Sequence, residues 1–259
     1  AAVLRWIFMA MAPPLWVLFP LQALHALTTN MCQLMTGALI QWRADPQIDL
    51  VLLDHSGERG FCAGGDIRML AESGAGDGAE ARGFFHTEYR LNHLLFDYPK
   101  PVVAVMDGIT MGGGVGLSMP ARYRVATERT TFAMPEINVG LAGGVSMLRT
   151  MVGRSFTRRM FYTGMRVPAA ELYRRGVLDE VVPADQLMPL ALQIAQEIAS
   201  KSPVAISYAK QAANMMDLMP QRDGYRFEQN FTMALAQTED AKEARAAFLE
   251  KRKPVYKGK

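Results

Sequence analysis

Two glycine-bearing loops carry the most distinctive chemistry of the chain, because each follows a short apolar segment. The first spans residues 60–66 (Gly-Phe-Cys-Ala-Gly-Gly-Asp) and the second contains three glycines at 112–114. Glycine lets a ligand approach the backbone closely and leaves the next amide N–H groups unpaired. Two such groups could bind an oxygen on which negative charge develops, as in a thioester enolate. For either loop taken alone, a tight turn between a strand and a helix is the simpler explanation.

One carboxylate in apolar surroundings could move a proton. Glu136 lies in the segment 132–140, among phenylalanine, methionine, isoleucine and valine. Burial in such surroundings would raise the pKa of a glutamate toward neutrality, which suits general acid–base catalysis. The pair Pro135-Glu136 is equally typical of the first turn of a helix, where an acidic side chain favours the helix dipole. Spacing alone leaves both interpretations open.

The motifs of several other enzyme classes are absent from the sequence. The second glycine loop lacks the G-x-G-x-x-G spacing of dinucleotide-binding folds, and no glycine loop ends in Gly-Lys-Ser or Gly-Lys-Thr. Ser118 does not lie in a G-x-S-x-G element. The two cysteines and four histidines show no metal-ligand spacing, and we interpret Cys62 as a packed thiol rather than a nucleophile. We therefore expect neither a metal nor a redox cofactor.

Length and composition are those of a folded globular protein. The chain has 259 residues, of which 50% are apolar and 20% are charged. These proportions exclude disordered and collagen-like chains. The net charge of +3, from 28 basic and 25 acidic side chains, is too small to indicate a nucleic acid or a membrane as the main partner. With only two cysteines, a reducing cytoplasmic location is the natural expectation.

The order of strand, glycine loop, helix and strand occurs twice, which predicts an α/β core with crossover connections. Residues 71–83, rich in alanine, glycine, glutamate, serine and aspartate, are expected to form a mobile surface loop. Short apolar runs predict buried strands, and helical spacing predicts the helices. The predicted strands are 50–53, 101–106 and 123–127. Helical spacing covers residues 22–43, where the helix could start at 28–30, and residues 82–96. From about residue 153 onward the pattern is helical.

The two ends of the chain differ in how clearly they can be interpreted. Ser202-Pro203 combines a cap with proline at the first helical position and predicts a helix to about Met216, and Glu239-Asp240 opens a last helix that Pro254 closes. We place a soft boundary near residue 200, with an α/β core at 1–200 and a helical region at 201–259. Sixteen of the first twenty residues are apolar. They could form a buried strand or packing arm, be the remnant of a targeting segment, or reflect an error in the sequence.

Together these motifs resemble the crotonase (enoyl-CoA hydratase/isomerase) superfamily over about residues 21–258. The resemblance rests on both glycine turns, on Pro135-Glu136 and on the closing segment 248–254. Segments 61–67 and 111–136 are especially similar to 3-hydroxyisobutyryl-CoA hydrolases. The resemblance implies a crotonase-like spiral of ββα turns with a C-terminal helical oligomerisation region. It also implies a homotrimer or a dimer of trimers.

The family pattern further implies a role for individual residues. The backbone N–H groups of Ala63 and Gly113 would bind the thioester oxygen, and Glu136 would be the acid/base carboxylate. Coenzyme A would enter as part of an acyl-CoA substrate, not as a separate cofactor. The substrate would be held by Ala23, Asp66, Ile67, Glu88, Phe248 and Lys251, the last two from this subunit or a neighbouring one.

Three departures from the family pattern bear on the reaction. Residues 1–20 do not resemble the family's first strand, hydratases carry a second glutamate where this chain has Gly116, and the shortened segment 141–144 lacks the aspartate of the hydrolase branch. With one carboxylate, isomerisation of an enoyl-CoA is favoured over hydration. Glu88 could supply a second acid, unless it is solvated on an exposed helix. Hydrolysis of a short 3-hydroxyacyl-CoA, or a catalytically idle acyl-CoA-binding oligomer, are the alternatives.

Overall fold

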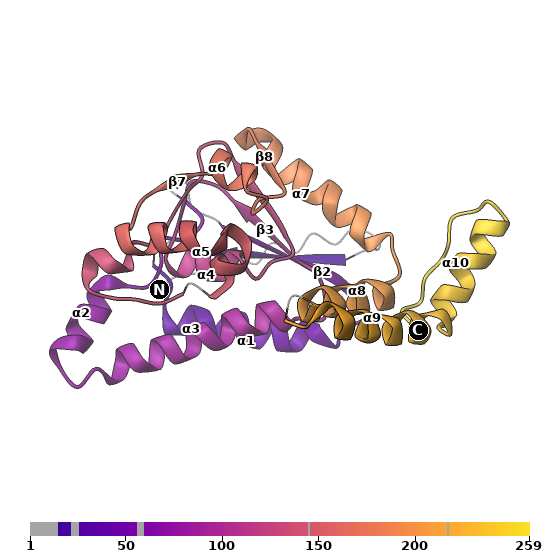
Figure 1. Ribbon diagram of the computed structural model, residues 1–259, viewed down its shortest axis with the longest axis horizontal. Coiled ribbons are helices and arrows are strands. Elements are labelled where there is room, and N and C mark those ends of the chain that lie inside the picture. Colours follow the sequence, from indigo (N-terminus) through magenta and orange to yellow (C-terminus); the bar gives the residue numbers. More distant parts are fainter. Residues whose placement is uncertain (1–14, 22–25, 56–59, 145, 217) are drawn as a thin grey trace.

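A computed structural model of the chain describes residues 15–21, 26–55, 60–144, 146–216 and 218–259 (Figure 1). Its larger sheet has five parallel strands in the order β1-β2-β3-β5-β8, and its smaller sheet has the order β4-β6-β7. The predicted buried strands are confirmed as β2, β3 and β5. The strands of the larger sheet are β1 (Leu15–Leu21), β2 (Ile48–His55), β3 (Val102–Met106), β5 (Tyr123–Thr127) and β8 (Glu180–Val182); those of the smaller are β4 (Ile109–Met111), β6 (Thr131–Ala133) and β7 (Val167–Pro168).

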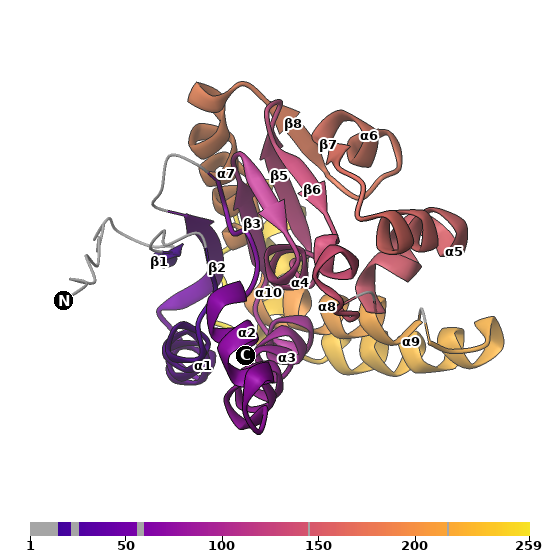
Figure 2. The same ribbon diagram turned by 90° about the vertical axis from the view of Figure 1, so that its left-hand side faces the viewer.

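Both faces of the larger sheet are covered, which explains why β3 is apolar along its whole length and why β2 contains the apolar run 50–53. Along β2, Leu50 and Leu52 belong to a cluster with helix α7 (Ala184–Ala199), whereas Val51 and Leu53 belong to the main core on the opposite face. Figure 2 shows α7 beside strands β3 and β5. Successive side chains of a strand alternate between faces, so one apolar run fills two cores.

The chain repeats a ββα turn, as the fold prediction requires. After β3 it forms β4 and then α4 (Gly113–Ser118), and after β5 it forms β6, the 3₁₀ turn η1 (Pro135–Val139) and α5 (Ser146–Thr163). After β2, a bridge between Cys62 and Thr110 joins the first glycine loop to the smaller sheet before α2 (Ile67–Ala75) begins. Each glycine turn therefore leads from the small sheet into a helix.

Helices α1 (Thr29–Arg43) and α3 (Ala79–Asp97) lie side by side beneath the sheets (Figure 1). Helix α1 begins where predicted, because the Thr28 hydroxyl accepts the Met31 N–H at 3.3 Å. The predicted mobile loop at 71–83 is wrong. Helix α2 reaches Ala75 and α3 starts at Ala79, and between them Gly78, with φ of +70°, makes a tight turn.

The remaining helices lie in the C-terminal part of the chain, where the nearly continuous helical pattern predicted from 153 is interrupted by β7 and β8. Helix α8 has the predicted bounds, and the domain boundary drawn near residue 200 stays a prediction. Among the described residues, no helix is both long and apolar enough to cross a lipid bilayer. These helices are α6 (Ala169–Arg174), α8 (Pro203–Met216), α9 (Gln221–Ala236) and α10 (Glu239–Leu249).

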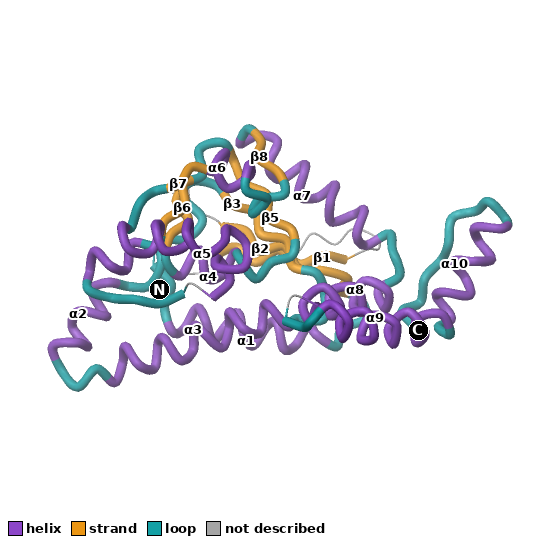
Figure 3. Tube along the Cα trace, viewed as in Figure 1, coloured by secondary structure: helices purple, strands orange, loops and turns teal. Residues whose placement is uncertain are grey.

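Residues 239–259, here called the C-terminal arm, project from the body of the molecule (Figure 3). Past the end of α10 the chain turns at Lys251, with φ of 55°, and runs back toward the start of the helix. The Glu243 carboxylate binds Arg252 at 2.5 Å and accepts the Val255 N–H at 2.9 Å, and the Asp240 N–H donates to the Lys259 carbonyl at 2.9 Å. The last ten residues are thus attached to the helix that precedes them.

At the other end, residues 15–21 form a strand that pairs in parallel with β2. Of the three interpretations of the N-terminal segment, a strand is the one that these residues adopt. Residues 1–14 and 22–25 lie outside the described part of the chain.

Candidate active site

The two glycine turns lie against each other at the ends of neighbouring strands. A Cβ atom added to Gly64 would lie 3.3 Å from the amide nitrogen of Gly113, and φ is +102° at Gly64 and +53° at Gly112. Both angles lie in the region that favours glycine. Hydrogen bonds fix each turn, from the Leu27 N–H to the Gly64 carbonyl at 2.6 Å and from the Gly112 N–H to the Ala133 carbonyl at 3.0 Å. The close approach of the turns thus depends on residues without side chains.

The backbone N–H groups of Ala63 and Gly113 are available to a ligand. Among the hydrogen bonds between described residues, none uses either group as a donor. Gly113 is the first residue of α4, and the first N–H groups of a helix have no partner within it. Both residues line the same pocket.

This pocket has a volume of about 470 Å³, within the usual range for small-molecule sites. Helices α2, α3 and α4, the turn η1 and the segment 141–144 surround it. Its walls are mainly apolar, which suits an acyl chain, and polar groups reach it at a few points. The residues that line the pocket include Ile67, Leu70, Phe84, Phe85, Glu88, Tyr89, Asn92, Gly113, Gly116 and Glu136.

Glu136 reaches the second glycine turn from η1. A Cβ atom added to Gly112 would lie 2.7 Å from Glu136 Oε1, so only glycine leaves room for the carboxylate at this point. Glu136 Oε2 is buried without a hydrogen-bond partner among the described residues. Burial raises the pKa of this carboxyl group, although the Glu136 N–H opposes the effect. An ionised carboxylate with one oxygen that lacks a donor, as Oε2 does, is suited to accept a proton from a ligand.

Glu88 reaches the same turn from α3. A Cβ atom added to Gly113 would lie 2.5 Å from Glu88 Oε1. Glu88 is only 5% exposed, and no hydrogen bond from a described residue contributes to the pKa of its carboxyl group. Burial, with a smaller contribution from the charge of Glu136, raises its pKa to about 7. The alternative that Glu88 is solvated on an exposed helix is therefore wrong. Near neutral pH its carboxyl group can either donate or accept a proton.

The sequence contained a signal for this burial. The buried residues of α3 are Phe84, Glu88, Leu91 and Leu95, which recur at helical spacing along one face. Glu88 occupies one position of an otherwise apolar stripe. A glutamate in such a stripe is a candidate for a buried functional group.

Two further polar residues of α3 were missed. Asn92 lies one turn after Glu88 and lines the pocket, and its Nδ2 would be 2.8 Å from a Cβ atom added to Gly116. The hydroxyl oxygen of Tyr89 accepts the Gly144 N–H, which joins α3 to the segment 141–144. The spacing of four between Glu88 and Asn92, which puts both on one helix face, could have identified Asn92.

The other predicted binding residues are placed differently. Ile67 lines the pocket, but Asp66 does not, and its carboxylate instead accepts two backbone N–H groups at the start of α2. Phe248 and Lys251 are on the C-terminal arm, at the opposite end of the molecule from α2 (Figure 1), with Phe248 83% exposed. The expectation for Ala23 concerns a position outside the described residues.

Cys62, beside the first turn, is buried, and burial raises the pKa of its thiol to about 11. Such a thiol is not ionised at neutral pH, in agreement with a packing role. Within the described ranges, no three histidine, cysteine, aspartate or glutamate side chains are grouped as a metal site would need.

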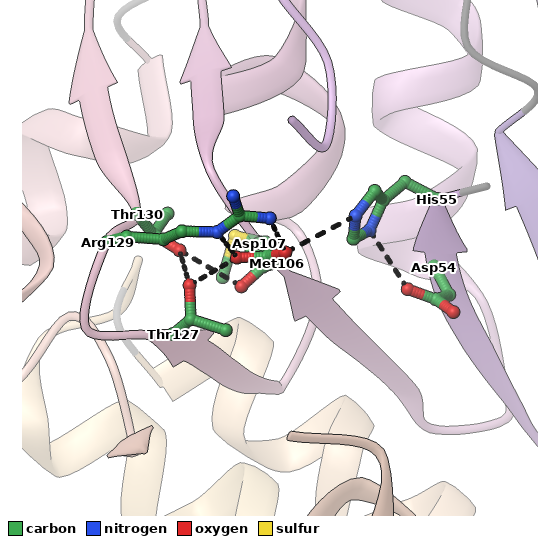
Figure 4. A network of polar contacts seen from close by, with 7 residues as sticks. All are labelled: Asp54, His55, Met106, Asp107, Thr127, Arg129 and Thr130. Carbon is green, nitrogen blue, oxygen red and sulfur yellow. Dashed lines mark hydrogen bonds and ion pairs between the residues drawn. The ribbon is translucent and has the colours of Figure 1, made fainter. Parts of the chain in front are cut away.

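A further buried carboxylate lies where the chain leaves strand β3 of the larger sheet (Figure 4). Asp107, directly after β3, accepts hydrogen bonds from Thr127 Oγ1 at 2.6 Å and from Arg129 Nε at 2.7 Å. His55 Nε2, at the end of β2, is 4.0 Å from Asp107 Oδ2. Mainly through Arg129, these contacts hold the pKa of the Asp107 carboxyl below its usual range. The network, which the sequence did not reveal, links the ends of β2, β3 and β5.

Comparisons with known proteins agree with this architecture. The family described as enoyl-CoA hydratase/isomerase matches residues 17–197. A carnitinyl-CoA dehydratase from Salmonella enteritidis is 34% identical over 234 residues, which cover 87% of each chain. The crystal structure of an enoyl-CoA hydratase from Bacillus anthracis superposes with a TM-score of 0.91 at 28% identity, covering 98% of this chain and 100% of that one.

A third relative matches a shorter region at higher identity. The mitochondrial 3-hydroxyisobutyryl-CoA hydrolase of Danio rerio is 42% identical over 172 residues, which cover 65% of this chain. The matched region spans 45% of that hydrolase, less than half of its length.

Proposed function

Because this chain belongs to the enoyl-CoA hydratase/isomerase family, we propose that it adds water to, or removes water from, an acyl-CoA thioester. The observation that carries the proposal is the position of two carboxylates, Glu136 and Glu88, whose Oε1 atoms lie over Gly112 and Gly113. Addition or removal of water needs one group for the proton at the α-carbon and another for the proton of the oxygen. The pocket supplies both.

Dehydration would begin with the thioester oxygen bound by the N–H groups of Ala63 and Gly113. Glu136 takes the proton from the α-carbon, and the negative charge that develops on the thioester oxygen is stabilised by these two donors. The bond from the β-carbon to the hydroxyl oxygen then breaks, and protonated Glu88 gives its proton to the departing oxygen. The products are a 2-enoyl-CoA and water. A proton passes from Glu136 to Glu88 through solvent before the next turnover.

Hydration would be the reverse reaction, with ionised Glu88 taking a proton from water. A pKa of about 7 makes both forms of Glu88 available at neutral pH. This matches the requirement that a catalytic acid or base has a pKa near the working pH.

The preference for isomerisation depended on Glu136 being the only carboxylate in the pocket. Since Glu88 is buried there as well, water chemistry becomes the first proposal and isomerisation of a 3-enoyl-CoA becomes an alternative. The 34% identity to a carnitinyl-CoA dehydratase over most of both chains supports the same order. The two buried, desolvated carboxylates also argue against a catalytically idle binding protein.

Hydrolysis of a 3-hydroxyacyl-CoA thioester is the second candidate. Its support is the 42% identity to a 3-hydroxyisobutyryl-CoA hydrolase over 172 residues. Against it, the segment 141–144 (Leu-Ala-Gly-Gly) provides no acid beside the pocket. We give it second place for this reason.

We further infer that the substrate brings coenzyme A with it and that a homotrimer or a dimer of trimers forms in the cytoplasm. In one chain, Phe248 and Lys251 are remote from the pocket, so a role for them in binding coenzyme A requires the arm of a second subunit.

Three substrates separate these functions. Purified protein is given a 2-enoyl-CoA, a 3-enoyl-CoA and a 3-hydroxyacyl-CoA, and conjugated double bonds and free thiol are followed by absorbance. We expect the first substrate to lose conjugation and the third to gain it, without free thiol. Free thiol alone would establish the hydrolase, and conjugation from the 3-enoyl-CoA alone would establish the isomerase. Flat traces with bound CoA ester would leave only a binding protein.

A further inference from the structure

Asn92, which lines the pocket, carries a buried acceptor atom without a hydrogen-bond partner among the described residues. In the described part of the chain, the buried side-chain atoms without a hydrogen-bond partner include only two from pocket-lining residues, Asn92 Oδ1 and Glu136 Oε2. Leaving a buried carboxamide oxygen unpaired is unfavourable, because the oxygen has lost its hydrogen bonds to water without gaining others. Asn92 Oδ1, like the Glu136 Oε2 atom of the proposed base, is buried without a partner and is therefore a candidate to bind a ligand.

The Asn92 carboxamide can occupy its position because Gly116, on helix α4, has no side chain. A Cβ atom added to Gly116 on α4 would lie 2.8 Å from Asn92 Nδ2. The carboxamide therefore fills the space that a side chain at 116 would need. Oδ1, the buried atom without a hydrogen-bond partner among the described residues, would be 3.8 Å from the same Cβ position.

The spacing between Asn92 and Glu88 on α3 lets both side chains bind the same oxygen atom. Side chains four residues apart on a helix have Cβ atoms about 5–6 Å apart. One oxygen atom placed between them can form two hydrogen bonds of about 2.7–3.0 Å. Glu88 would exchange the proton of that oxygen, and Asn92 Oδ1 would accept a second hydrogen bond from it.

We propose that Asn92 binds the oxygen that the enzyme adds or removes, either as water or as the hydroxyl group on the β-carbon of the substrate. The inference rests on the proposed function and extends it to a substrate class. The preferred ligands are acyl-CoA esters with a hydroxyl group at C3, in contrast to saturated esters of the same length. Asn92 acts here as a specificity residue, distinct from Glu136, which acts at the α-carbon.

Two reactions of one protein test the proposal. The first is dehydration of a 3-hydroxyacyl-CoA. The second is exchange of the α-carbon protons of a saturated acyl-CoA for deuterium in heavy water, in which Glu136 removes a proton and a solvent deuteron returns. Exchange uses the same base and backbone donors but involves no hydroxyl group or added water.

The variant Asn92→Leu keeps the branching at Cγ without hydrogen-bonding groups, and Asn92→Ala is the second variant if the larger leucine does not fit. We expect kcat/KM for dehydration to fall about 10- to 100-fold, as for loss of one buried hydrogen bond, with little change in exchange. Asn138→Ala, which removes another asparagine of the pocket lining, is the matched control and should leave the ratio of the two rates unchanged.

Equal losses of dehydration and exchange in the Asn92 variants, or no loss of dehydration, would overturn the role of Asn92 alone. Wild-type protein that catalyses neither reaction would overturn the proposed function together with it. Binding to the Glu136→Gln variant gives a reading that does not depend on Asn92 variants folding. Calorimetry should show tighter binding of the 3-hydroxyacyl-CoA than of the saturated ester, and equal or weaker binding would contradict the proposal.

Discussion

Two buried carboxyl groups near the glycine turns have opposite surroundings. Asp107 is 9% exposed and accepts hydrogen bonds from Thr127 and Arg129, and its pKa is lowered. Glu88 is 5% exposed, and its pKa of about 7 has no contribution from a hydrogen bond of any described residue. Glu88 lies deeper in the protein, and only Asp107 has donors and positive charges that stabilise its ionised form. A carboxylate surrounded by donors stabilises the fold, whereas one without them is ready to exchange a proton with a ligand.

Glu136, like Glu88, is a desolvated carboxylate of the pocket. Among the variants considered, Glu136→Gln is expected to have the largest effect on catalysis. Loss of a general base lowers kcat by about 100- to 10,000-fold. The melting temperature should not fall, because the variant removes a desolvated charge and no hydrogen bond from another side chain. Dehydration kinetics and thermal unfolding measure both quantities. Wild-type activity in this variant would assign the α-carbon proton to a different group.

Glu88→Gln should reduce dehydration and hydration by about 100-fold, and α-proton exchange on a saturated acyl-CoA much less. Dehydration needs the protonated form of Glu88, so the wild-type rate should fall as the pH rises above about 7. The variant should lack this decline. Rates measured from pH 5.5 to 9 provide the test, and an identical decline in both proteins would assign the titration to a different residue.

The two groups should also affect stability with opposite dependence on pH. Glu88 has a pKa of about 4.3 when unfolded and about 7 when folded. The folded state thus holds an extra proton between these values, and its stability falls as the pH rises through this window, by on the order of 1–3 kcal/mol. The lowered pKa of Asp107 gives stability that is present at neutral pH and is lost only in acid.

Urea unfolding at pH 5 and pH 8 measures this effect. The wild type should be less stable at pH 8, and Glu88→Gln should abolish most of the difference. If the variant retains the full difference, the buried group responsible is not Glu88.

The smallest effect on catalysis is expected for Asp107→Asn. Loss of the charge-assisted bond to Arg129 lowers the free energy of unfolding by about 1–3 kcal/mol. Turnover should change far less than in Glu88→Gln. Denaturant unfolding and kcat, measured on the same preparation, test this. A large fall in kcat at unchanged stability would make Asp107 part of the reacting site.

Elements with local signals could be predicted from the sequence, and elements defined by packing could not. Ser202-Pro203 specifies the start of α8 because capping and the fixed φ of proline act within a few residues. Residues 71–83 have the composition of a loop, yet they form the end of α2 and the start of α3. Packing of α3 against α1 and α2 outweighs the weak local preferences there.

The same distinction applies to the candidate site. The turn residues Ala63 and Gly113 and the carboxylate Glu136 could be proposed because each lies in a short, recognisable motif. The apolar stripe of α3 does indicate that Glu88 is buried. The groups that Glu88 meets, and the placement of Asn92 beside Gly116, depend on how α3 lies against α4, which is a tertiary contact. The Asp107 network unites groups from three strands that are separated in the chain by up to 74 residues, from His55 to Arg129.

The return of the C-terminal residues along α10 has a practical consequence for engineering. Lys259 lies at the base of the arm, where Ser202 Oγ donates to Asp240 at 2.7 Å, and Phe248 and Lys251 occupy its tip. A purification tag or fluorescent protein fused after Lys259 would emerge beside α8, far from the tip. A label attached there would therefore leave Phe248 and Lys251 uncovered, so that their proposed contact with a second copy can be tested directly.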